Sequence, residues 1–247
     1  MKIVFPETTN PNIQEAIASC PEITAVPAHD LSDACFQIKS GLADRMIAGI
    51  DYSSRDVILS CRDNLGMVGK TFSSSIVFSR DNVNYYVLAD IATCKHPTEE
   101  QLYDIVLHTY ATAKKVLRTE PKVAILSFST LGSGGKDDTM TIAQNVVKKI
   151  RSTHPEILID GEMQLDAAID PLVASKKCPS SPVAGDANVL ICPDINSGNI
   201  LYKAIERFGG FTAAGPILQG FNYPVSDLSR GSSVDDIIAT IKTMELL

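Results

Sequence analysis

Short apolar runs alternate with amphipathic segments along most of the chain. Strands are predicted at residues 2–5, 23–26, 45–50, 123–128, 157–159, 187–192 and 216–218. Helices are predicted at residues 31–40, 53–64, 163–176, 198–208 and 233–245, and in the segments around 11–20, 102–117 and 142–150. Strands that alternate with helices in this way predict an α/β protein with a largely parallel sheet.

Two of the predicted helices carry clear start signals. Asn10 followed by Pro11 suits the N-cap and the first helical position. Thr98 and Gln101 have the spacing of a capping box in front of a long apolar stripe. We therefore expect helices to begin at these two places.

One part of the chain departs from the alternation. A turn-rich stretch at residues 80–84 separates apolar runs at 72–78 and 85–91, which predicts a hairpin. The most suitable domain boundary follows it at residues 92–97, directly before the capped helix.

Composition narrows the class of protein. Hydrophobic residues make up 45% and charged residues 21% of the 247 residues, a balance typical of a globular protein and not of a disordered one. A formal net charge of −7 without any Trp argues against a nucleic-acid-binding protein, which needs a basic face. No apolar run reaches the roughly 18 residues of a membrane-spanning helix, and we predict no membrane partner.

The cysteines and histidines give no sign of a metal site. The six cysteines are scattered without a CxxC pair, and the four histidines have no ligand spacing with them. The start of the chain is too short in its apolar part for a signal peptide. We therefore expect reduced thiols, a cytoplasmic protein and no bound metal.

Loops that follow strands are the places where open α/β sheets bind ligands. The loop at residues 127–135 offers small hydroxyl residues and glycines whose N–H groups could hold an anion. It matches neither a Walker loop nor a dinucleotide fingerprint, and a flexible strand-to-helix connection is the alternative. Its candidate binding residues are Ser129, Thr130, Gly132 and Ser133.

Two further loops have suitable chemistry. Beyond residues 193–198, helical spacing places Asn199 and Tyr202 on one side of a helix with Lys203 adjacent. The alternative is an ordinary helix cap and a solvated lysine. After the third strand, Ser53 and Ser54 could contact a ligand, or one of them could simply be an N-cap.

The loop at residues 224–236 carries a fixed cation. Arg230 could bind phosphate oxygens with its planar fork, and Ser229 offers a hydroxyl beside it. Asp235 and Asp236 fall in the first turn of the following helix, where capping and interaction with the helix dipole are the alternative role. Together the loops predict an anion or phosphate site, and they leave the reaction open.

Several motifs occur in the order found in one known family. The segments are 127–133 (SFSTLGS), 160–170 (DGEMQLDAAID), 183–187 (VAGDA), 188–203 (NVLICPDINSGNILYK), 207–210 (RFGG), 215–220 (GPILQG) and 224–237 (PVSDLSRGSSVDDI). They closely resemble the phosphate acetyltransferase/phosphate butyryltransferase family over roughly residues 85–247. Upstream, residues 41–49 (GLADRMIAG) and the hairpin resemble the family weakly.

The resemblance implies a fold and an activity. The family moves an acyl group between coenzyme A and inorganic phosphate, giving an acyl phosphate, with no metal and no tightly bound cofactor. Its fold has two α/β domains with the site in the cleft between them, an architecture like that of isocitrate and isopropylmalate dehydrogenases. It implies a domain at 1–96 completed by 221–247, a second at 97–220, and a homodimer that takes small-molecule substrates.

The resemblance also assigns residues. Ser229, Arg230 and Asp236 fall on the catalytic positions: Arg230 would hold phosphate, Ser229 would hydrogen-bond it or the oxyanion, and Asp236 would take the thiol proton. The implied substrate-binding residues are Ser53, Ser54, Ser129, Thr130, Gly132, Ser133, Asn199, Tyr202, Lys203 and Gln219.

Departures from the family pattern leave an alternative function. Compared with typical members the chain is expected to be short and reduced in its N-terminal half. The family loop reads like HTTADTVRP with a substrate-binding Arg, whereas residues 52–60 read YSSRDVILS and place Leu59 at that position. Arg55 or Arg62 could substitute. The alternative is a catalytically weak paralogue that binds acyl-CoA or phosphate, or a partner subunit. A dehydrogenase is a third possibility, for which no dinucleotide fingerprint is present.

Overall fold

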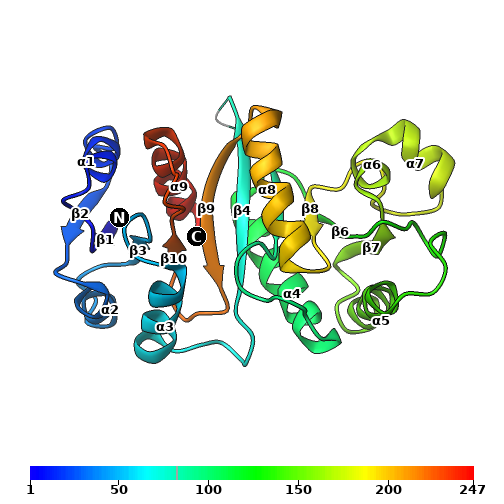
Figure 1. Cartoon of the computed structure of the whole chain (residues 1–247), viewed down its shortest axis with the longest axis horizontal. Coiled ribbons are helices and arrows are strands. Elements are labelled where there is room, and N and C mark those ends of the chain that lie inside the picture. The colour runs from blue at the N-terminus through cyan, green and yellow to red at the C-terminus, as the bar shows by residue number, and fades with distance from the viewer. Residues whose placement is uncertain (82) are drawn as a thin grey trace.

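A computed structural model describes residues 1–81 and 83–247, in which the strands form one ten-stranded sheet with the order β2-β1-β3-β10-β9-β4-β5-β8-β6-β7 (Figure 1). The strands are β1 (Lys2–Phe5), β2 (Thr24–Pro27), β3 (Arg45–Ala48), β4 (Ser73–Arg80), β5 (Val83–Ala89), β6 (Lys122–Leu126), β7 (Leu158–Met163), β8 (Val189–Ile191), β9 (Thr212–Gln219) and β10 (Val225–Asp227). The predicted α/β class with a largely parallel sheet is confirmed.

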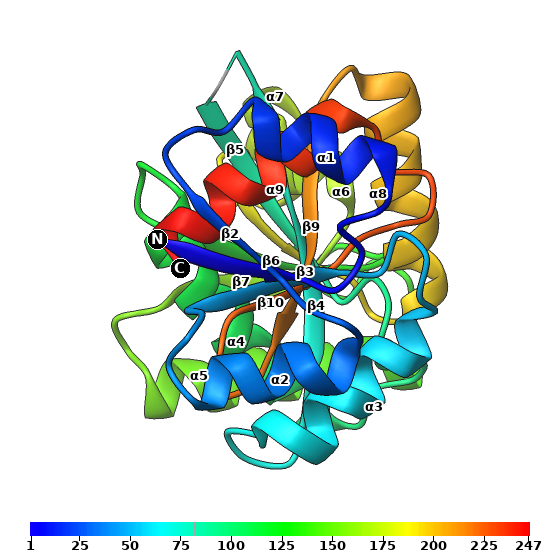
Figure 2. The ribbon, with the colours of Figure 1, turned by 90° about the vertical axis from the view of Figure 1, so that its left-hand side faces the viewer.

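Helices lie on both faces of this sheet (Figure 2). They are α1 (Pro11–Ala18), α2 (Leu31–Lys39), α3 (Ser54–Leu65), α4 (Glu99–Val116), α5 (Asp138–Thr153), α6 (Leu165–Ile169), α7 (Pro171–Lys177), α8 (Ile195–Gly209) and α9 (Val234–Leu246). Both predicted start signals are confirmed: Asn10 caps α1, and Thr98 and Gln101 form the capping box of α4. The predicted hairpin is the antiparallel pair β4–β5; Asn82, part of its predicted turn, lies outside the described residues.

The sheet has two parallel parts joined by an antiparallel centre. β2, β1, β3 and β10 run parallel to one another, and so do β5, β8, β6 and β7. Between them, β9 pairs antiparallel with β10 on one side and with β4 on the other. The strands cross at large angles in the end-on view of Figure 2, which shows the strong twist of the sheet.

Strand residues alternate between the two faces and feed separate apolar clusters. In β1, Ile3 and Phe5 pack with α1 and α9, whereas Val4 packs with α2 and α3 on the opposite face. In β8, Val189 and Ile191 pack with α4 and α5, and the intervening residue joins a cluster with α6 and α8. This period of two is the geometry of a strand buried on both faces.

Two predictions of elements are wrong. The single helix predicted at 163–176 is two short helices, because Asp170 caps a new helix whose first residue is Pro171. The segment predicted as a loop after residue 218 contains β10, which extends the sheet between β3 and β9. With only three residues, β10 is too short to show an alternating pattern.

Candidate active site

A cavity of about 250 Å³ lies where the loops after β3 and β10 meet the loop after β5 and the start of α8. The register places Asp227 beside Ala48, so these two loops leave the sheet side by side. Six residues singled out from the sequence line the cavity: Ser54, Asn199, Tyr202, Lys203, Ser229 and Arg230. The structure thus brings together side chains that are up to 176 residues apart in the chain (230 − 54).

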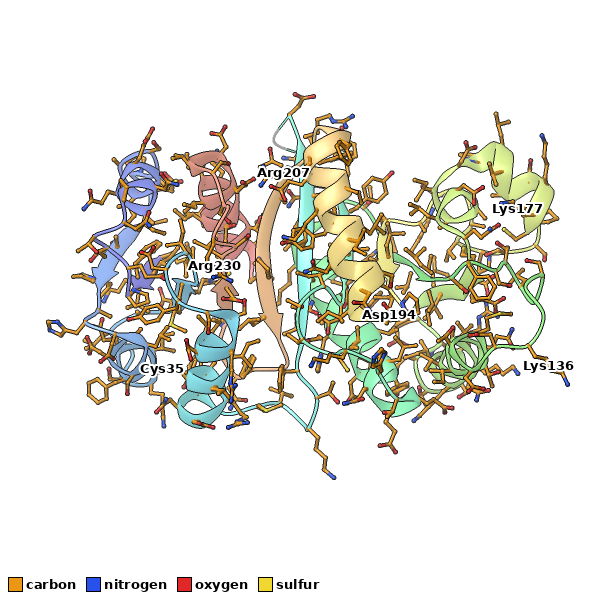
Figure 3. The ribbon with its side chains drawn as sticks, in the orientation of Figure 1. Cys35, Lys136, Lys177, Asp194, Arg207 and Arg230 are labelled. Atoms are coloured by element: carbon orange, nitrogen blue, oxygen red, sulfur yellow. The ribbon has the colours of Figure 1, made fainter. Side chains whose placement is uncertain are left out.

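The loop after β10 presents Ser229 and Arg230. A turn closed by the Ser232 N–H, which donates to the Ser229 carbonyl at 2.9 Å, returns the chain toward α9. Arg230 is exposed at the cavity, and Arg207 of α8 approaches the same loop (Figure 3). A Cβ on Gly231 would lie 3.6 Å from Arg207 Nη2. Two guanidinium groups therefore lie near this turn.

Asp236 lies next to the cavity in the first turn of α9. The Ser233 N–H and hydroxyl donate to Asp236 Oδ2 at 2.9 and 2.7 Å, which completes a capping box. Asp236 is buried, and it lines a small adjoining hollow together with Ser229 and Tyr202. The capping role considered for Asp236 is therefore present, and the carboxyl group also faces the region of Ser229.

Glu206 is a site residue that sequence reasoning missed. It lines the same hollow as Asp236, with a side chain only 14% exposed, and pairs with Arg207 at 3.1 Å. Burial raises the pKa of Glu206; the charge of Arg207 opposes the shift, and Asp236 adds to it. Its spacing of four residues from Tyr202 on α8 was the signal that could have found it.

The start of α8 packs tightly against the loop after β5. Asp194 caps the helix (Figure 3), and Asn199 donates from Nδ2 to the carbonyl of Ile91 at 3.1 Å. Gly198 makes this approach possible, because a Cβ there would lie 2.0 Å from the Asp90 carbonyl oxygen. The contact turns Asn199 and the following turn of α8 toward the cavity.

Tyr202 and Lys203 form a pair at the cavity. The Lys203 ammonium hydrogen-bonds the Tyr202 hydroxyl and lies 4.4 Å from the centre of its ring. Tyr202 is buried, whereas Lys203 is exposed. The predicted placement of these residues on one side of α8 is seen in the structure, and it gives the cavity a second cation beside Arg230.

Buried carboxylates hold two of the surrounding loops. Glu7 accepts hydrogen bonds from the N–H groups of Gly49, Asp51 and Tyr52 at 2.7–2.9 Å. Asp90 accepts hydrogen bonds from the β4 backbone at 3.0 Å and from the N–H groups of its own loop. These bonds fix the backbone that forms the cavity wall.

The loop with the predicted anion-binding residues holds a carboxylate of the chain itself. Ser129 Oγ and the Gly132 N–H donate to Glu162 Oε1 at 2.9 and 2.7 Å, and Thr130 N–H donates to Ser133 Oγ at 3.0 Å. Burial alone would raise the pKa of Glu162, but the Gly132 N–H, Gln144 and Ser129 lower it below its usual range. The loop follows β6, two strands from β5 in the sheet, and none of its residues lines the 250 Å³ cavity.

Ser53 and Gln219 also lie outside this cavity. Ser53 is the N-cap of α3 and donates to Asp56 at 2.6 Å. Gln219 is buried between β9 and α4, where it accepts from Ser73 at 3.0 Å and donates to Thr112 at 2.7 Å. It borders a larger, mostly apolar cavity of about 430 Å³. Because that cavity gathers none of the other predicted residues, the smaller cavity is the better candidate site.

Neither of the two arginines considered as replacements lines the cavity. Arg55 is exposed on α3, and Arg62 pairs with Asp63 at 2.8 Å.

Across the described residues, no cluster of three or more His, Cys, Asp or Glu side chains has the arrangement of a metal site. Within the same part of the chain, every helix is too short or too polar to cross a bilayer.

Comparisons with known proteins identify the family. Residues 24–244 match the model of the family described as phosphate acetyl/butaryl transferase, so the match begins well upstream of the motifs noted in the sequence. A phosphate acetyltransferase from Clostridium acetobutylicum is 41% identical over 218 residues, which are 84% of this chain and 64% of that protein. The chain therefore spans just under two thirds of the length of this relative.

Solved structures show the same relationship. A phosphotransacetylase from Streptococcus pyogenes superposes with a TM-score of 0.86 at 30% identity, covering 100% of this chain and 94% of the other. A putative 4-hydroxythreonine-4-phosphate dehydrogenase from Salmonella typhimurium, at 11% identity and a TM-score of 0.61, covers 100% and 90% and shares the fold alone. The chain belongs to the phosphate acetyl/butaryl transferase family.

Proposed function

We propose that this protein transfers a short acyl group between coenzyme A and inorganic phosphate. The observation that carries the proposal is the single cavity in which Arg230, Lys203 and Ser229 meet, with Asp236 adjoining. Two cations and a hydroxyl in one cavity suit a phosphate group. Family membership supports the same reaction, and coenzyme A enters it as a substrate and not as a tightly bound cofactor.

The residues can be given roles in the direction that forms acyl-CoA. Asp236 accepts the proton of the coenzyme A thiol while the sulfur bonds to the carbonyl carbon of the acyl phosphate. The carbon–oxygen bond to phosphate then breaks, and the proton ends on the released phosphate. Arg230 holds the phosphate oxygens as their charge grows, and Ser229 donates a hydrogen bond to the phosphate or to the oxyanion. All hydrogen bonds from the described residues to this carboxylate reach Oδ2, which leaves Oδ1 to accept the proton.

The other predicted residues are proposed as substrate contacts. Asn199, Tyr202, Lys203 and Ser54 bind the reacting groups in the cavity. We propose that Ser53 and the loop residues Ser129, Thr130, Gly132 and Ser133 contact the longer part of coenzyme A. The hydrogen bonds of Gln219 join β9 to α4 and support a structural role.

We further propose a two-domain architecture like that of isocitrate and isopropylmalate dehydrogenases, with the site in the cleft. The fold shared with a putative 4-hydroxythreonine-4-phosphate dehydrogenase supports it. The proposed first domain, 1–96 with 221–247, is supported by the pairing of β10 with β3 and by the packing of α9 on α1. The second domain is 97–220.

A homodimer and a cytoplasmic location complete the proposal. Of the fifteen residues of α8, only Gly198 and Tyr202 are buried within the described chain, whereas Ile200 and Phe208 are 69% and 91% exposed. An apolar helix side of this kind suits a second copy of the chain.

The six cysteines are unpaired thiols, as expected in a reducing compartment.

A thiol-release assay tests the reaction. The protein is mixed with acetyl-CoA or butyryl-CoA, with and without phosphate, and free thiol is measured. We expect phosphate-dependent release that falls about 100-fold or more in Arg230→Ala and Asp236→Asn. Asp235→Asn removes an exposed charge from the same helical turn and is the matched control, with activity near wild type. No phosphate-dependent release from the folded wild-type protein would refute the proposal.

A further inference from the structure

Asp227, the last residue of β10, is a buried carboxylate that has no hydrogen-bond partner among the described residues. It is 1% exposed, it borders the 250 Å³ cavity, and neither Oδ1 nor Oδ2 accepts a hydrogen bond from the described residues. A buried polar group that loses water without gaining a partner costs about 1–3 kcal/mol, and more when it is charged. The fold therefore gains nothing from this carboxylate as it stands.

Three other buried carboxylates, which hold loops in place, are treated differently. Glu7, Asp90 and Glu162 each accept at least three hydrogen bonds from the chain. The chain thus supplies donors wherever a carboxylate only holds a loop. Asp227 departs from the rule that a buried carboxylate has hydrogen-bond donors, and such a departure at a site is expected of a residue with a functional role.

The surroundings of Asp227 connect it to the cavity through Ser54. A Cβ on Gly49 would lie 2.4 Å from Asp227 Oδ1, so the missing side chain of Gly49 makes room for the carboxylate. Ser54 and Asp227 line the same cavity, and the Ser54 hydroxyl opposes the rise in the pKa of Asp227, although no hydrogen bond joins the two side chains in this structure. Less than 1 Å² of each Asp227 oxygen is exposed, so Ser54 is the group that a ligand meets.

We propose that Asp227, acting through Ser54, makes the cavity selective for an oxyanion that carries a proton, and so for inorganic phosphate over sulfate. This inference rests on the proposed function, which places phosphate in the cavity. Asp227 is a positioning residue here, since Ser54 makes the contact.

The selectivity follows from the donor and acceptor properties of a hydroxyl. An ionised Asp227 can only accept, so once a ligand turns the Ser54 hydroxyl toward this unpartnered carboxylate, Ser54 Oγ is left with lone pairs toward the cavity. Inorganic phosphate keeps at least one P–O–H group near neutral pH and can donate to those lone pairs. Sulfate has no proton to donate, so its oxygen would face an acceptor. A site that hydrogen-bonds a ligand hydroxyl strongly rejects the analogue that lacks it.

The charge state of Asp227 gives the selectivity a pH window. Glu7 after β1 and Cys61 on α3 interact electrostatically with Asp227, and Tyr52 after β3, Lys203 on α8 and Arg230 after β10 line the same cavity. Burial, with a smaller contribution from Glu7, raises the pKa of Asp227 to about 6 against the opposing Ser54 hydroxyl. Below that pH the carboxyl is protonated and can donate to Ser54, whose proton then becomes available to any oxyanion. Selectivity is therefore expected above pH 6 and lost below it.

Isothermal titration calorimetry with sodium phosphate and sodium sulfate at pH 8 and constant ionic strength tests the inference. We expect the wild-type protein to bind phosphate at least tenfold more tightly than sulfate. In Asp227→Asn the amide can donate to Ser54, and the ratio should fall to within about threefold of one. Ser54→Ala should lose the preference as well, and it provides a second test if the first variant does not fold. Asp235→Asn, with the same charge change at an exposed position, should keep the wild-type ratio.

The outcomes separate this inference from the proposed function. Equal binding of the two anions by the wild type, or an unchanged ratio in folded Asp227→Asn and Ser54→Ala, would overturn the inference even if thiol release is phosphate-dependent. A ratio that collapses in both variants while the wild type releases no thiol would support the inference and refute only the proposed reaction.

Discussion

Close contacts at single glycines determine how the cavity wall is built, and Gly49 is the one to test. Its φ is +107°, and an added Cβ would meet Asp227 Oδ1 at 2.4 Å and the Leu228 backbone at 2.8 Å. Gly49→Ala is expected to lower the free energy of unfolding by at least about 2 kcal/mol, through backbone strain and overpacking. Gly41→Ala is the matched control, since φ there is +74° with nothing within 4 Å of the new atom.

Urea unfolding of the two glycine variants checks this prediction. Gly41→Ala should lose only the strain of a positive φ, about 1–2 kcal/mol. Equal losses in both variants would show that the contact with Asp227 has no energetic weight.

Some residues of the site can be predicted from the sequence around them, whereas others depend on which strands are neighbours in the sheet. Arg230, Lys203 and Tyr202 were expected at a binding site from the cation on the loop, the helical spacing and the family motifs, and they line one cavity. Glu7 and Asp227 could not, because their roles depend on which strands become neighbours and on the register between them. No pattern within a short window of sequence contains that information.

The first turn of α9 combines a structural and a proposed chemical role. Ser233 caps the helix and holds the Asp236 carboxylate at 2.7 Å, and Thr98 caps α4 with the same kind of box away from the cavity. Ser233→Ala and Thr98→Ala are each expected to lower the free energy of unfolding by about 1 kcal/mol. Only Ser233→Ala should also reduce kcat/KM, on the order of tenfold, because it frees the side chain of Asp236.

Parallel measurement of unfolding and of thiol release distinguishes the two caps. If both variants keep full activity, or both lose it to the same extent, the cap does not position the carboxylate.

Secondary structure was predictable where the sequence pattern is long or capped. The box at Thr98 and the stripe behind it define α4 in advance. The strand β10 was missed because three residues are too few to show an alternation of apolar and polar side chains. The break between α6 and α7 at Pro171 was missed because apolar residues continue across it. Both errors arise where tertiary contacts or one residue outweigh the local pattern.

Strand order is a property of the whole molecule, and the sequence does not reveal it. β10 inserts between β3 and β9, so the loop with Arg230 comes to lie beside the loop with Ser54. The cavity exists because of this insertion. Alternation of strands and helices predicted the fold class, but the neighbours of each strand depend on contacts between residues far apart in the chain.

The exposed side of α8 yields a prediction about assembly. Ile200 and Phe208 are spaced to lie on one side of α8. Asn199 and Lys203 of the same helix line the cavity. If two copies pack through this side, the helix that supports the site is held by the partner. We expect the wild type to sediment as a dimer and the double variant Ile200→Asp/Phe208→Asp to sediment as a monomer with weaker activity.

Phe36→Asp supplies the control for sedimentation equilibrium. Phe36 is 65% exposed on α2, in the other part of the molecule, so this variant should remain a dimer with wild-type activity. A monomeric wild type, or dissociation caused equally by Phe36→Asp, would contradict the assignment to α8. Dissociation without loss of activity would show instead that a single copy holds α8 rigidly enough for Lys203 and Asn199 to act, which places the whole site within one chain.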